Sequence, residues 1–477
     1  MSKVFLFGID SLDLILLNKF KNELPNFSKL MDNGPKISMT SVEPPDSASA
    51  WPSIFTGLNP AEHGMVYFVD PLDKVSSTVN EIVDSAPIKG KAFWDIAGQN
   101  GKRVCILFPH VCYPGWEVNG IMVVRDEVDN QIKSYPENIA SGVNVSDLMV
   151  LQGLPTNNKK RLEYIEKGKK LILNEMEFSI QLYKKEEWDL FFTYSSVMDY
   201  ISHNFWNYMD DKDPSYSGDN NPFKDTIKNF YLLYDQVLGE YLSLIDPDTI
   251  FFVFSDHGHG MRPPKVFDLN KYLTKMNLYF PKTKDNRVNP IATSSGFLLN
   301  SMKDYVNENP WTWNFAMRGL NLFPNIRKKF TTPPSVDWSK TIAYSSDQSG
   351  IKAYNYGGVI INTLEDEDYE RTRNLIINKL KDIEVDSKKL FRFVCKREDI
   401  YSGPFISKYP DLVFELTDEY GIGQIQGSSL FGECSTHNIQ PGSHKRYSTV
   451  FLTSNLNHFG KQNLTLMDIR NIILNLL

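Results

Sequence analysis

Three features of the sequence predict an α/β fold with a mostly parallel central sheet. Apolar runs of strand length alternate with segments of helical periodicity, and Gly-rich or polar turns follow these runs. The chain has 477 residues, of which 41% are hydrophobic, so it can bury a large core. Apolar strands that alternate with helices are typical of a parallel sheet covered on both faces. We therefore expect one elaborated α/β domain.

The individual elements are predicted from these runs in chain order. The apolar run at 4–9 predicts the first strand, and the amphipathic pattern at 12–20 predicts the helix after it. A second strand is expected at 37–41, followed by a Pro/Ser turn and a helix that begins near Trp51. The pattern then predicts a helix at 93–100, a strand at 104–108, a long amphipathic helix at 159–185 and buried strands at 190–194 and 249–254. Near the end it predicts strands at 341–344, 358–361 and 449–452 and a helix from Leu466.

The alternation breaks between residues 281 and 334, where Pro, Asn, aromatic residues and the basic cluster 327–329 gather. We interpret this stretch as an insertion that covers the functional site of the protein as a cap. The predicted organisation is a first part of the core at 1–280, a cap segment at 281–334 and a second part of the core at 335–477. The polar segment 210–222 is expected to be an exposed loop.

Charge and composition exclude several classes of protein. The net charge is −7 and basic residues are mixed among acids, so no basic stripe indicates a nucleic-acid partner. No run of about 18 apolar residues predicts a membrane span, and the first apolar run lacks the flanks of a signal peptide. The four cysteines have no CxxC spacing and do not suggest a disulfide framework. These features predict a soluble, cytoplasmic protein, and they do not define its oligomeric state.

Acids and histidines with metal-ligand spacing follow the predicted strands. Asp10 ends the first strand, and Asp256 and His257 follow the strand at 249–254. Asp199 and His203 lie four residues apart, so a helix would place both on one face. Ligands at the carboxyl ends of parallel strands meet at one edge of the sheet. Each pair alone could be incidental, but together they predict a site for divalent cations.

Three further histidines are weighed against these ligands. His444 lies in a polar turn before the strand at 449–452 and is a candidate ligand, although His437 is close enough in sequence to compete. His259 is expected to lie behind the ligands and not to bind metal itself. The remaining histidines, His63, His110 and His458, are assigned structural or surface roles.

Ser47 and Ser49 are the candidate nucleophiles, because they lie at the start of a predicted helix. A helix N-terminus favours anions through its free N–H groups and its dipole. A serine there could be activated by a bound cation and attack phosphorus. Either serine could instead simply cap the helix.

Taken together, these strings resemble the alkaline phosphatase superfamily, specifically the type I phosphodiesterase/nucleotide pyrophosphatase family and its intracellular prokaryotic branch. The resemblance runs through most of the chain, in order: Phe7-Gly8-Ile9-Asp10, the 50–64 block, Phe93-Trp94-Asp95-Ile96 with 101–104, the 113–120 string, Asp199 with His203, Ser255-Asp256-His257-Gly258, the 336–341 string, Pro410-Asp411-Leu412 and Gly442-Ser443-His444. It implies an alkaline phosphatase-like three-layer sandwich.

The resemblance also implies a ligand set and a mechanism. One cation would take Asp199, His203 and His444, and the other Asp10, Asp256 and His257, both cations being Zn²⁺ or Mn²⁺. Counted back from Thr56-Gly57, the family's nucleophile falls on Ser47, with Ser49 as the fallback. The implied reaction is in-line attack by Ser47 on the phosphorus of a small-molecule phosphoester, through a phosphoserine-type intermediate.

Departures from the family pattern keep other functions open. The animal-type enzymes have an Asn where this chain has Ala50, and relatives often have a small residue and Gly where this chain has Val124 and Arg125. A phosphodiesterase or nucleotide pyrophosphatase is the leading prediction. A phosphomonoesterase, a phosphonate hydrolase and a phosphomutase of the same superfamily are the near alternatives. From a different class, a catalytically silent binding protein remains open.

Overall fold

Seven strands form the large sheet, and their order places the ends of three central strands side by side. The computed structural model describes residues 3–35, 37–66, 68–69, 85–126, 131–142, 145–282, 336–348, 353–362, 366–425, 428–454 and 463–477. Within these residues, the strand order of the large sheet is β21-β8-β1-β7-β4-β5-β6. The bounds are β21 Phe451–Thr453, β8 Ile250–Phe254, β1 Val4–Ile9, β7 Leu190–Ser195, β4 Val104–Leu107, β5 Gly120–Arg125 and β6 Ile132–Tyr135. The five strands from β8 to β5 run parallel, while β21 and β6 run antiparallel to their neighbours.

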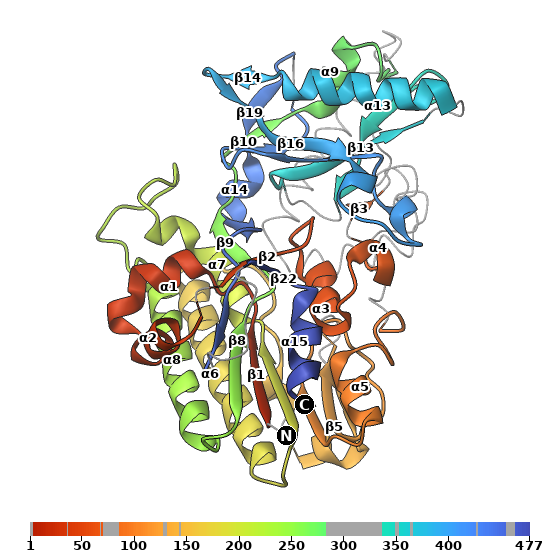
Figure 1. Cartoon of the computed structure of the whole chain (residues 1–477). Coiled ribbons are helices and arrows are strands. Elements are labelled where there is room, and N and C mark those ends of the chain that lie inside the picture. The colour runs from red at the N-terminus through yellow and green to blue at the C-terminus, as the bar shows by residue number, and fades with distance from the viewer. Residues whose placement is uncertain are drawn as a thin grey trace, which may run out of the picture.

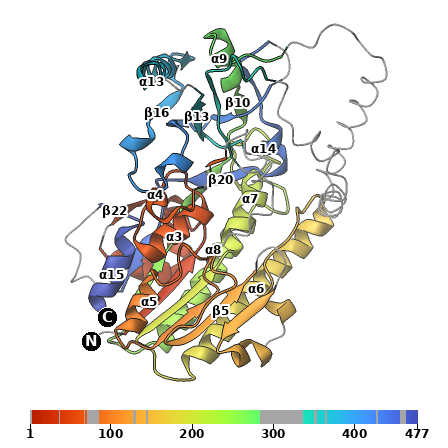
Figure 2. The same cartoon turned by 90° about the vertical axis from the view of Figure 1, so that its right-hand side faces the viewer.

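Helices cover both faces of this sheet, which gives three layers (Figures 1 and 2). On one face lie α1 Leu14–Phe20, α2 Pro25–Asn33, α6 Asn158–Tyr183, α7 Val197–Met209 and α8 Thr226–Leu244. On the other face lie α3 Ser47–Thr56, α5 Phe93–Gln99 and α15 Asp468–Leu476. Strand residues buried on both sides, such as Phe5 and Phe192, join the helices in one apolar cluster. The predicted α/β class with a mostly parallel sheet is confirmed.

A smaller lobe with its own apolar core lies at the carboxyl-terminal edge of the large sheet (Figure 1). Its four-stranded sheet has the order β11 Ala343–Ser345, β13 Tyr356–Ile361, β17 Leu412–Leu416 and β16 Phe391–Lys396. Its three-stranded sheet has the order β18 Tyr420–Ile422, β10 Lys265–Phe267 and β19 Phe431–Glu433. The helices α9 Leu269–Lys275 and α13 Asp366–Lys381 complete this smaller lobe.

Short elements connect the large sheet to the smaller lobe. The strands β9 Gly258–Met261 and β20 Gly442–Lys445 pair with each other and lie between the two bodies (β9 in Figure 1, β20 in Figure 2). Among the described residues, three short strand pairs and two short helices also occur: β2 Ser38–Thr40 with β22 Asn463–Thr465, β3 Phe68–Val69 with β12 Asp347–Gln348, β14 Glu384–Val385 with β15 Lys388–Lys389, and the helices α4 Pro60–His63 and α14 Ser435–Ile439.

The structure differs from the predicted elements at two places that matter for the site. The helix expected near Trp51 begins at Ser47, and Asp46 caps it with its side chain, so neither Ser47 nor Ser49 is the cap. The strands expected at 341–344 and 358–361 belong to the smaller lobe and not to the large sheet. The predicted cap segment at 281–334 lies almost wholly outside the described residues, so the predicted domain boundaries stay predictions. All four cysteines are free thiols, as expected.

Candidate active site

Three neighbouring strands deliver acidic residues to one edge of the large sheet. Asp10 follows β1 directly, and Asp256 and His257 follow β8, the parallel neighbour of β1. On the other side of β1, the strand β7 runs into α7, which carries Asp199 in its first turn. Asp10 and Asp256 are buried and Asp199 is nearly so. The topology of the sheet therefore brings together three carboxylates that lie far apart in the chain.

Four imidazoles surround these carboxylates. His203 follows Asp199 by one turn of α7, and its Nε2 lies 3.3 Å from Asp199 Oδ1. His444 on β20 pairs in register with His259 on β9, and its Nε2 also lies 3.3 Å from Asp199 Oδ1. The Nε2 of His257 lies 3.6 Å from Asp10 Oδ1 and 3.2 Å from Asp256 Oδ2.

The ligand atoms form two groups that share His257. Those of Asp10, Asp256 and His257 lie within 4.8 Å of one another, and so do those of Asp199, His257 and His444. His203 reaches the second group as well, because its Nε2 lies 2.9 Å from His444 Nε2. All six candidate ligands thus lie in one cluster, and the second group holds His257 in the place that the predicted set gave to His203.

Charge in this cluster is distributed as a cation site requires. Burial and the neighbouring carboxylates of Asp256 and Asp199 raise the pKa of Asp10 well above its usual value, and burial raises the pKa of Asp256 to about 7. Packed carboxylates of this kind need a compensating positive charge to ionise together.

The imidazoles are held in the neutral form that binds metal. Burial lowers the pKa of His203 to about 4, and burial together with the neighbouring imidazoles lowers the pKa of His444 and of His259. The other ring nitrogens of two ligands face carbonyls: Nδ1 of His203 lies 2.9 Å from Gly442 O, and Nδ1 of His444 lies 2.9 Å from Pro45 O. These contacts turn both Nε2 atoms toward Asp199. Carboxylate oxygens and neutral imidazoles together form a donor set that fits Zn²⁺ or Mn²⁺.

Ser47 lies at the edge of this cluster. It is the first residue of α3, is partly exposed, and its Oγ lies 3.1 Å from His257 Nε2 and donates to Asp10 Oδ1 at 3.4 Å. Ser49 is fully buried, and its hydroxyl has no hydrogen-bond partner among the described residues. Of the two candidate serines, only Ser47 has its hydroxyl beside the carboxylates.

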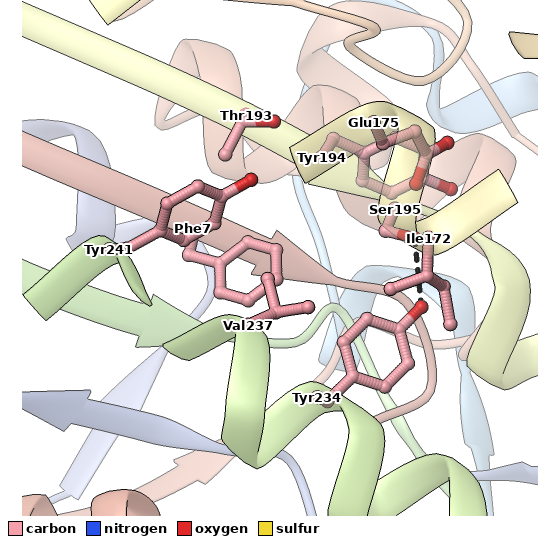
Figure 3. A pocket seen from close by; sticks show the side chains of 9 residues that line it. All are labelled: Phe7, Ile172, Glu175, Thr193, Tyr194, Ser195, Tyr234, Val237 and Tyr241. Atoms are coloured by element: carbon pink, nitrogen blue, oxygen red, sulfur yellow. Dashed lines mark hydrogen bonds between the residues drawn. The ribbon is translucent and has the colours of Figure 1, made fainter. Parts of the chain in front are cut away.

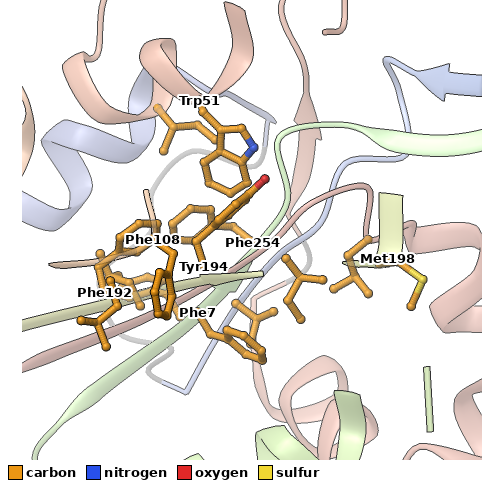
Figure 4. Close-up of a cluster of buried hydrophobic side chains, with 14 of the residues drawn as sticks. Phe7, Trp51, Phe108, Phe192, Tyr194, Met198 and Phe254 are labelled. Atoms are coloured by element: carbon orange, nitrogen blue, oxygen red, sulfur yellow. The ribbon is translucent and has the colours of Figure 1, made fainter. Parts of the chain in front are cut away.

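Three side chains that orient the site were missed as functional residues from the sequence. Tyr194 OH donates to Asp10 Oδ2 at 2.6 Å, and Trp51 Nε1 donates to the same oxygen at 3.0 Å. The two rings pack edge to face with centroids 4.9 Å apart, and Figure 4 shows their polar atoms close together at the edge of the buried cluster. The hydroxyl of Ser11 lies 2.7 Å from Asp199 Oδ1 and 3.0 Å from His259 Nδ1.

The signals for these three residues in the sequence were weak. Ser11 directly follows Asp10, and it adopts a φ of 60°, which is uncommon for a residue other than glycine. Tyr194 ends an apolar strand, and Trp51 lies in a helix that is buried on nearly every side. The Nδ1 of His259 lies 3.0 Å from Ser11 Oγ and 3.8 Å from Asp199 Oδ1.

Two glycines allow the close approach of the strands that carry the histidines. A Cβ on Gly442 would lie 2.2 Å from the carbonyl oxygen of Ser202, so only glycine lets β20 pack against α7. A Cβ on Gly258 would lie 2.0 Å from Ser448 Oγ and 2.6 Å from Asp13 Oδ2. The glycines of the two motifs therefore serve packing around the site.

Two residues noted in the sequence have partners outside the carboxylate cluster: His437, which could compete with His444, and Arg125, which departs from the family pattern. His437 lies 2.9 Å from both Asp213 Oδ1 and Arg262 O, away from the cluster of carboxylates. Arg125 is buried in an ion pair with Glu175 at 2.8 Å.

Glu175 also lines a cavity of about 10 Å³ beside β7 (Figure 3). That volume suits about one water molecule and excludes a substrate.

The fold and the cluster define the chain as an enzyme of the phosphoester hydrolase class. Residues 4–424 match the model of the type I phosphodiesterase/nucleotide pyrophosphatase family, and the chain belongs to this family, which is metal-dependent. A comparison with curated proteins gave no match. No helix within the described ranges is both long and apolar enough to cross a membrane.

Solved structures of the alkaline phosphatase superfamily share the fold. Phosphonoacetate hydrolase from Sinorhizobium meliloti, in complex with phosphonoformate, has a TM-score of 0.57 and 12% identity over 99% of this chain and 95% of that chain. An inactive variant of murine ectonucleotide pyrophosphatase/phosphodiesterase 5, in complex with AMP, has a TM-score of 0.50 and 14% identity over 100% of this chain and 96% of that chain. The predicted alkaline phosphatase-like sandwich is thereby confirmed.

Proposed function

We propose that the chain is a two-metal phosphodiesterase or nucleotide pyrophosphatase with Ser47 as its nucleophile. The observation that carries this proposal is the position of the Ser47 hydroxyl, at the first residue of a helix and within 3.4 Å of Asp10 and His257. A partly exposed hydroxyl with these neighbours can reach the phosphorus atom of an ester that approaches from solvent. Family membership supports the reaction class, and the position of the hydroxyl supports the nucleophile.

Six side chains would hold the two cations. Asp10, Asp256 and His257 would hold one, and Asp199, His203 and His444 the other, with Zn²⁺ or Mn²⁺ as the ions that suit these donors. When bound, such cations lower the pKa of a hydroxyl and neutralise charge on phosphoryl oxygens.

Several groups of the chain have separate roles in the proposed reaction. Asp10 Oδ1 receives the hydrogen bond of the Ser47 hydroxyl and so directs the proton away from the attacking lone pair. Tyr194 and Trp51 hold the other oxygen of Asp10 in place. The N-terminus of α3 favours the negative charge that develops beside it. In the attack, the hydroxyl proton would pass to Asp10 Oδ1 while the bond from Oγ to phosphorus forms, and the ester bond breaks to release an alkoxide that takes a proton from water. Water then cleaves the phosphoserine, which releases a phosphate monoester and restores the Ser47 hydroxyl.

Turnover of two chromogenic esters tests the proposal. The protein loaded with zinc or manganese should hydrolyse bis-p-nitrophenyl phosphate faster than p-nitrophenyl phosphate. Turnover of neither ester would contradict the proposal, and faster turnover of the monoester would favour the phosphomonoesterase.

The variant Ser47→Ala should lower kcat by about a thousandfold or more, with metal content nearly intact. Ser49→Ala is the matched control and should stay active, because its buried hydroxyl has no contact with the carboxylates among the described residues. A phosphorylated Ser47 peptide in quenched reactions would identify the intermediate. Loss of activity in Ser49→Ala alone would move the nucleophile by two residues.

A further inference from the structure

A cleft with a volume of about 540 Å³ opens beside the proposed metal ligands. It begins at His444 and His259 and runs outward between the large sheet's helices and the smaller lobe. One wall comes from the start of α1 and the end of α7, and the other comes from β13, β16 and β17. This volume lies in the range of sites for small organic molecules. An ester with its phosphorus at Ser47 would extend one of its organic groups into this cleft.

Basic and acidic side chains line the cleft in equal number, and three of the basic ones, Arg392, Lys445 and Arg446, lie beside carboxylates, whereas Lys19 and Lys212 are exposed on the opposite wall. Five basic and five acidic side chains line it. Arg392 binds Glu415 at 2.7 Å and also pairs with Asp418, whose other oxygen accepts from Lys445 at 2.8 Å. Arg446 lies 3.4 Å from Glu43. A second phosphate group beside Arg392, Lys445 and Arg446 would need cations that are not already paired, as in anion sites built from Arg and Lys.

The accessible part of the cleft combines polar groups with an aromatic face. Tyr447 is 54% exposed, and its hydroxyl donates to Glu415 Oε2 at 3.2 Å. Asp418 is half-exposed, whereas the carboxyl group of Glu43 is buried and is not accessible to a bound group. Carboxylates have more lone pairs than these ion pairs use, so they can accept hydrogen bonds from hydroxyl groups. A long acyl chain would instead remove water from the paired charges without replacing its hydrogen bonds.

We propose that this cleft receives a neutral, hydroxyl-rich group of the substrate, a sugar or polyol esterified to the phosphorus. The proposal rests on the proposed function, because the cleft selects a substrate only if the chemistry takes place at Ser47. The paired carboxylates accept hydrogen bonds from vicinal hydroxyls, and the face of Tyr447 covers one side of the bound group. A ribose presents the same vicinal hydroxyls, so a nucleoside is a second possible source of this chemistry.

A series of p-nitrophenyl phosphodiesters tests the proposal on the metal-loaded full chain. The leaving group is constant, and the second ester group is ethyl, glyceryl, glucosyl or phosphoethyl. The glyceryl and glucosyl esters should exceed the ethyl ester in kcat/KM by about tenfold or more, as expected for hydrogen bonds to charged groups, and the phosphoethyl ester should be the poorest. Equal values across the series would overturn the proposal while leaving the hydrolase intact. No turnover of any ester, ethyl included, would refute the proposed function.

Two further comparisons distinguish whether the hydroxyls belong to a ribose or to a free sugar or polyol. A uridin-5′-yl ester that exceeds both its 2′-deoxy counterpart and the glyceryl ester would place the hydroxyls on a ribose. A glucosyl or glyceryl ester that exceeds the uridinyl ester would place them on a free sugar or polyol.

The variant Asp418→Asn tests the role of the paired charges. It keeps the size of the side chain but leaves Arg392 and Lys445 with one negative charge fewer. The ratio of kcat/KM between the glyceryl and phosphoethyl esters should fall about tenfold, because the freed cations now favour the anionic group. Asp382→Asn, at an exposed position after α13, is the matched control and should leave this ratio unchanged. A general loss of activity with an unchanged ratio would show a structural role and overturn the proposal.

Discussion

Removal of the Tyr194 hydroxyl tests whether Asp10 is a metal ligand that the hydrogen bond from Tyr194 orients. In Tyr194→Phe the ring keeps its edge-to-face contact with Trp51, and the 2.6 Å hydrogen bond to Asp10 Oδ2 is lost. A hydrogen bond to a charged group contributes about 1.5–3 kcal/mol. Because Trp51 still donates to the same oxygen, we expect the lower end of this range. That value corresponds to about a tenfold weaker metal affinity, in line with the effect of losing a group that orients a ligand.

Competition with a chromophoric chelator measures this change for zinc. Tyr234→Phe is the matched control, since this buried tyrosine bonds Ser195 at 2.8 Å and contacts no proposed ligand by a hydrogen bond among the described residues. It should bind zinc like the wild type. Unchanged zinc affinity in Tyr194→Phe, or an equal loss in both variants, would refute the role assigned to Asp10 and Tyr194.

Two other predictions concern metal removal and pH. Chelation with EDTA should abolish hydrolysis of bis-p-nitrophenyl phosphate, and zinc or manganese should restore it; activity that survives complete removal of metal would contradict the two-metal proposal. Burial lowers the pKa of His63 from 6.5 to about 3, so the unfolded chain takes up a proton that the native chain does not as pH falls below 6.5. The free energy of unfolding should therefore fall by up to about 1.4 kcal/mol per pH unit between pH 6.5 and 3 through this group, and urea titrations of His63→Gln should show a smaller slope.

The parts of the site that the sequence could predict are those that depend on strand ends. Asp10 and Asp256 each follow an apolar run, and parallel strands place such residues at one edge regardless of the details of packing. The pair Asp199 and His203 could be predicted from its helical spacing alone. His444 was harder, because its place depends on the pairing of β20 with β9, which joins segments far apart in the chain.

Other features depend on packing that no local pattern encodes. The side chain of Asp46 caps α3, so the helix begins at Ser47 and not near Trp51 as predicted. Tyr194 and Trp51 look like ordinary apolar core residues until the fold turns their polar atoms toward Asp10. The smaller lobe escaped prediction because its short strands have the same apolar pattern as strands of the large sheet.

Anomalous diffraction at the zinc edge, from crystals of the zinc-loaded protein, tests the two-metal proposal most directly. We predict two peaks per chain, one bounded by Asp10, Asp256 and His257 and the other by Asp199, His203 and His444, with Ser47 Oγ beside the first. A single peak, or peaks that these side chains do not bound, would contradict the proposal.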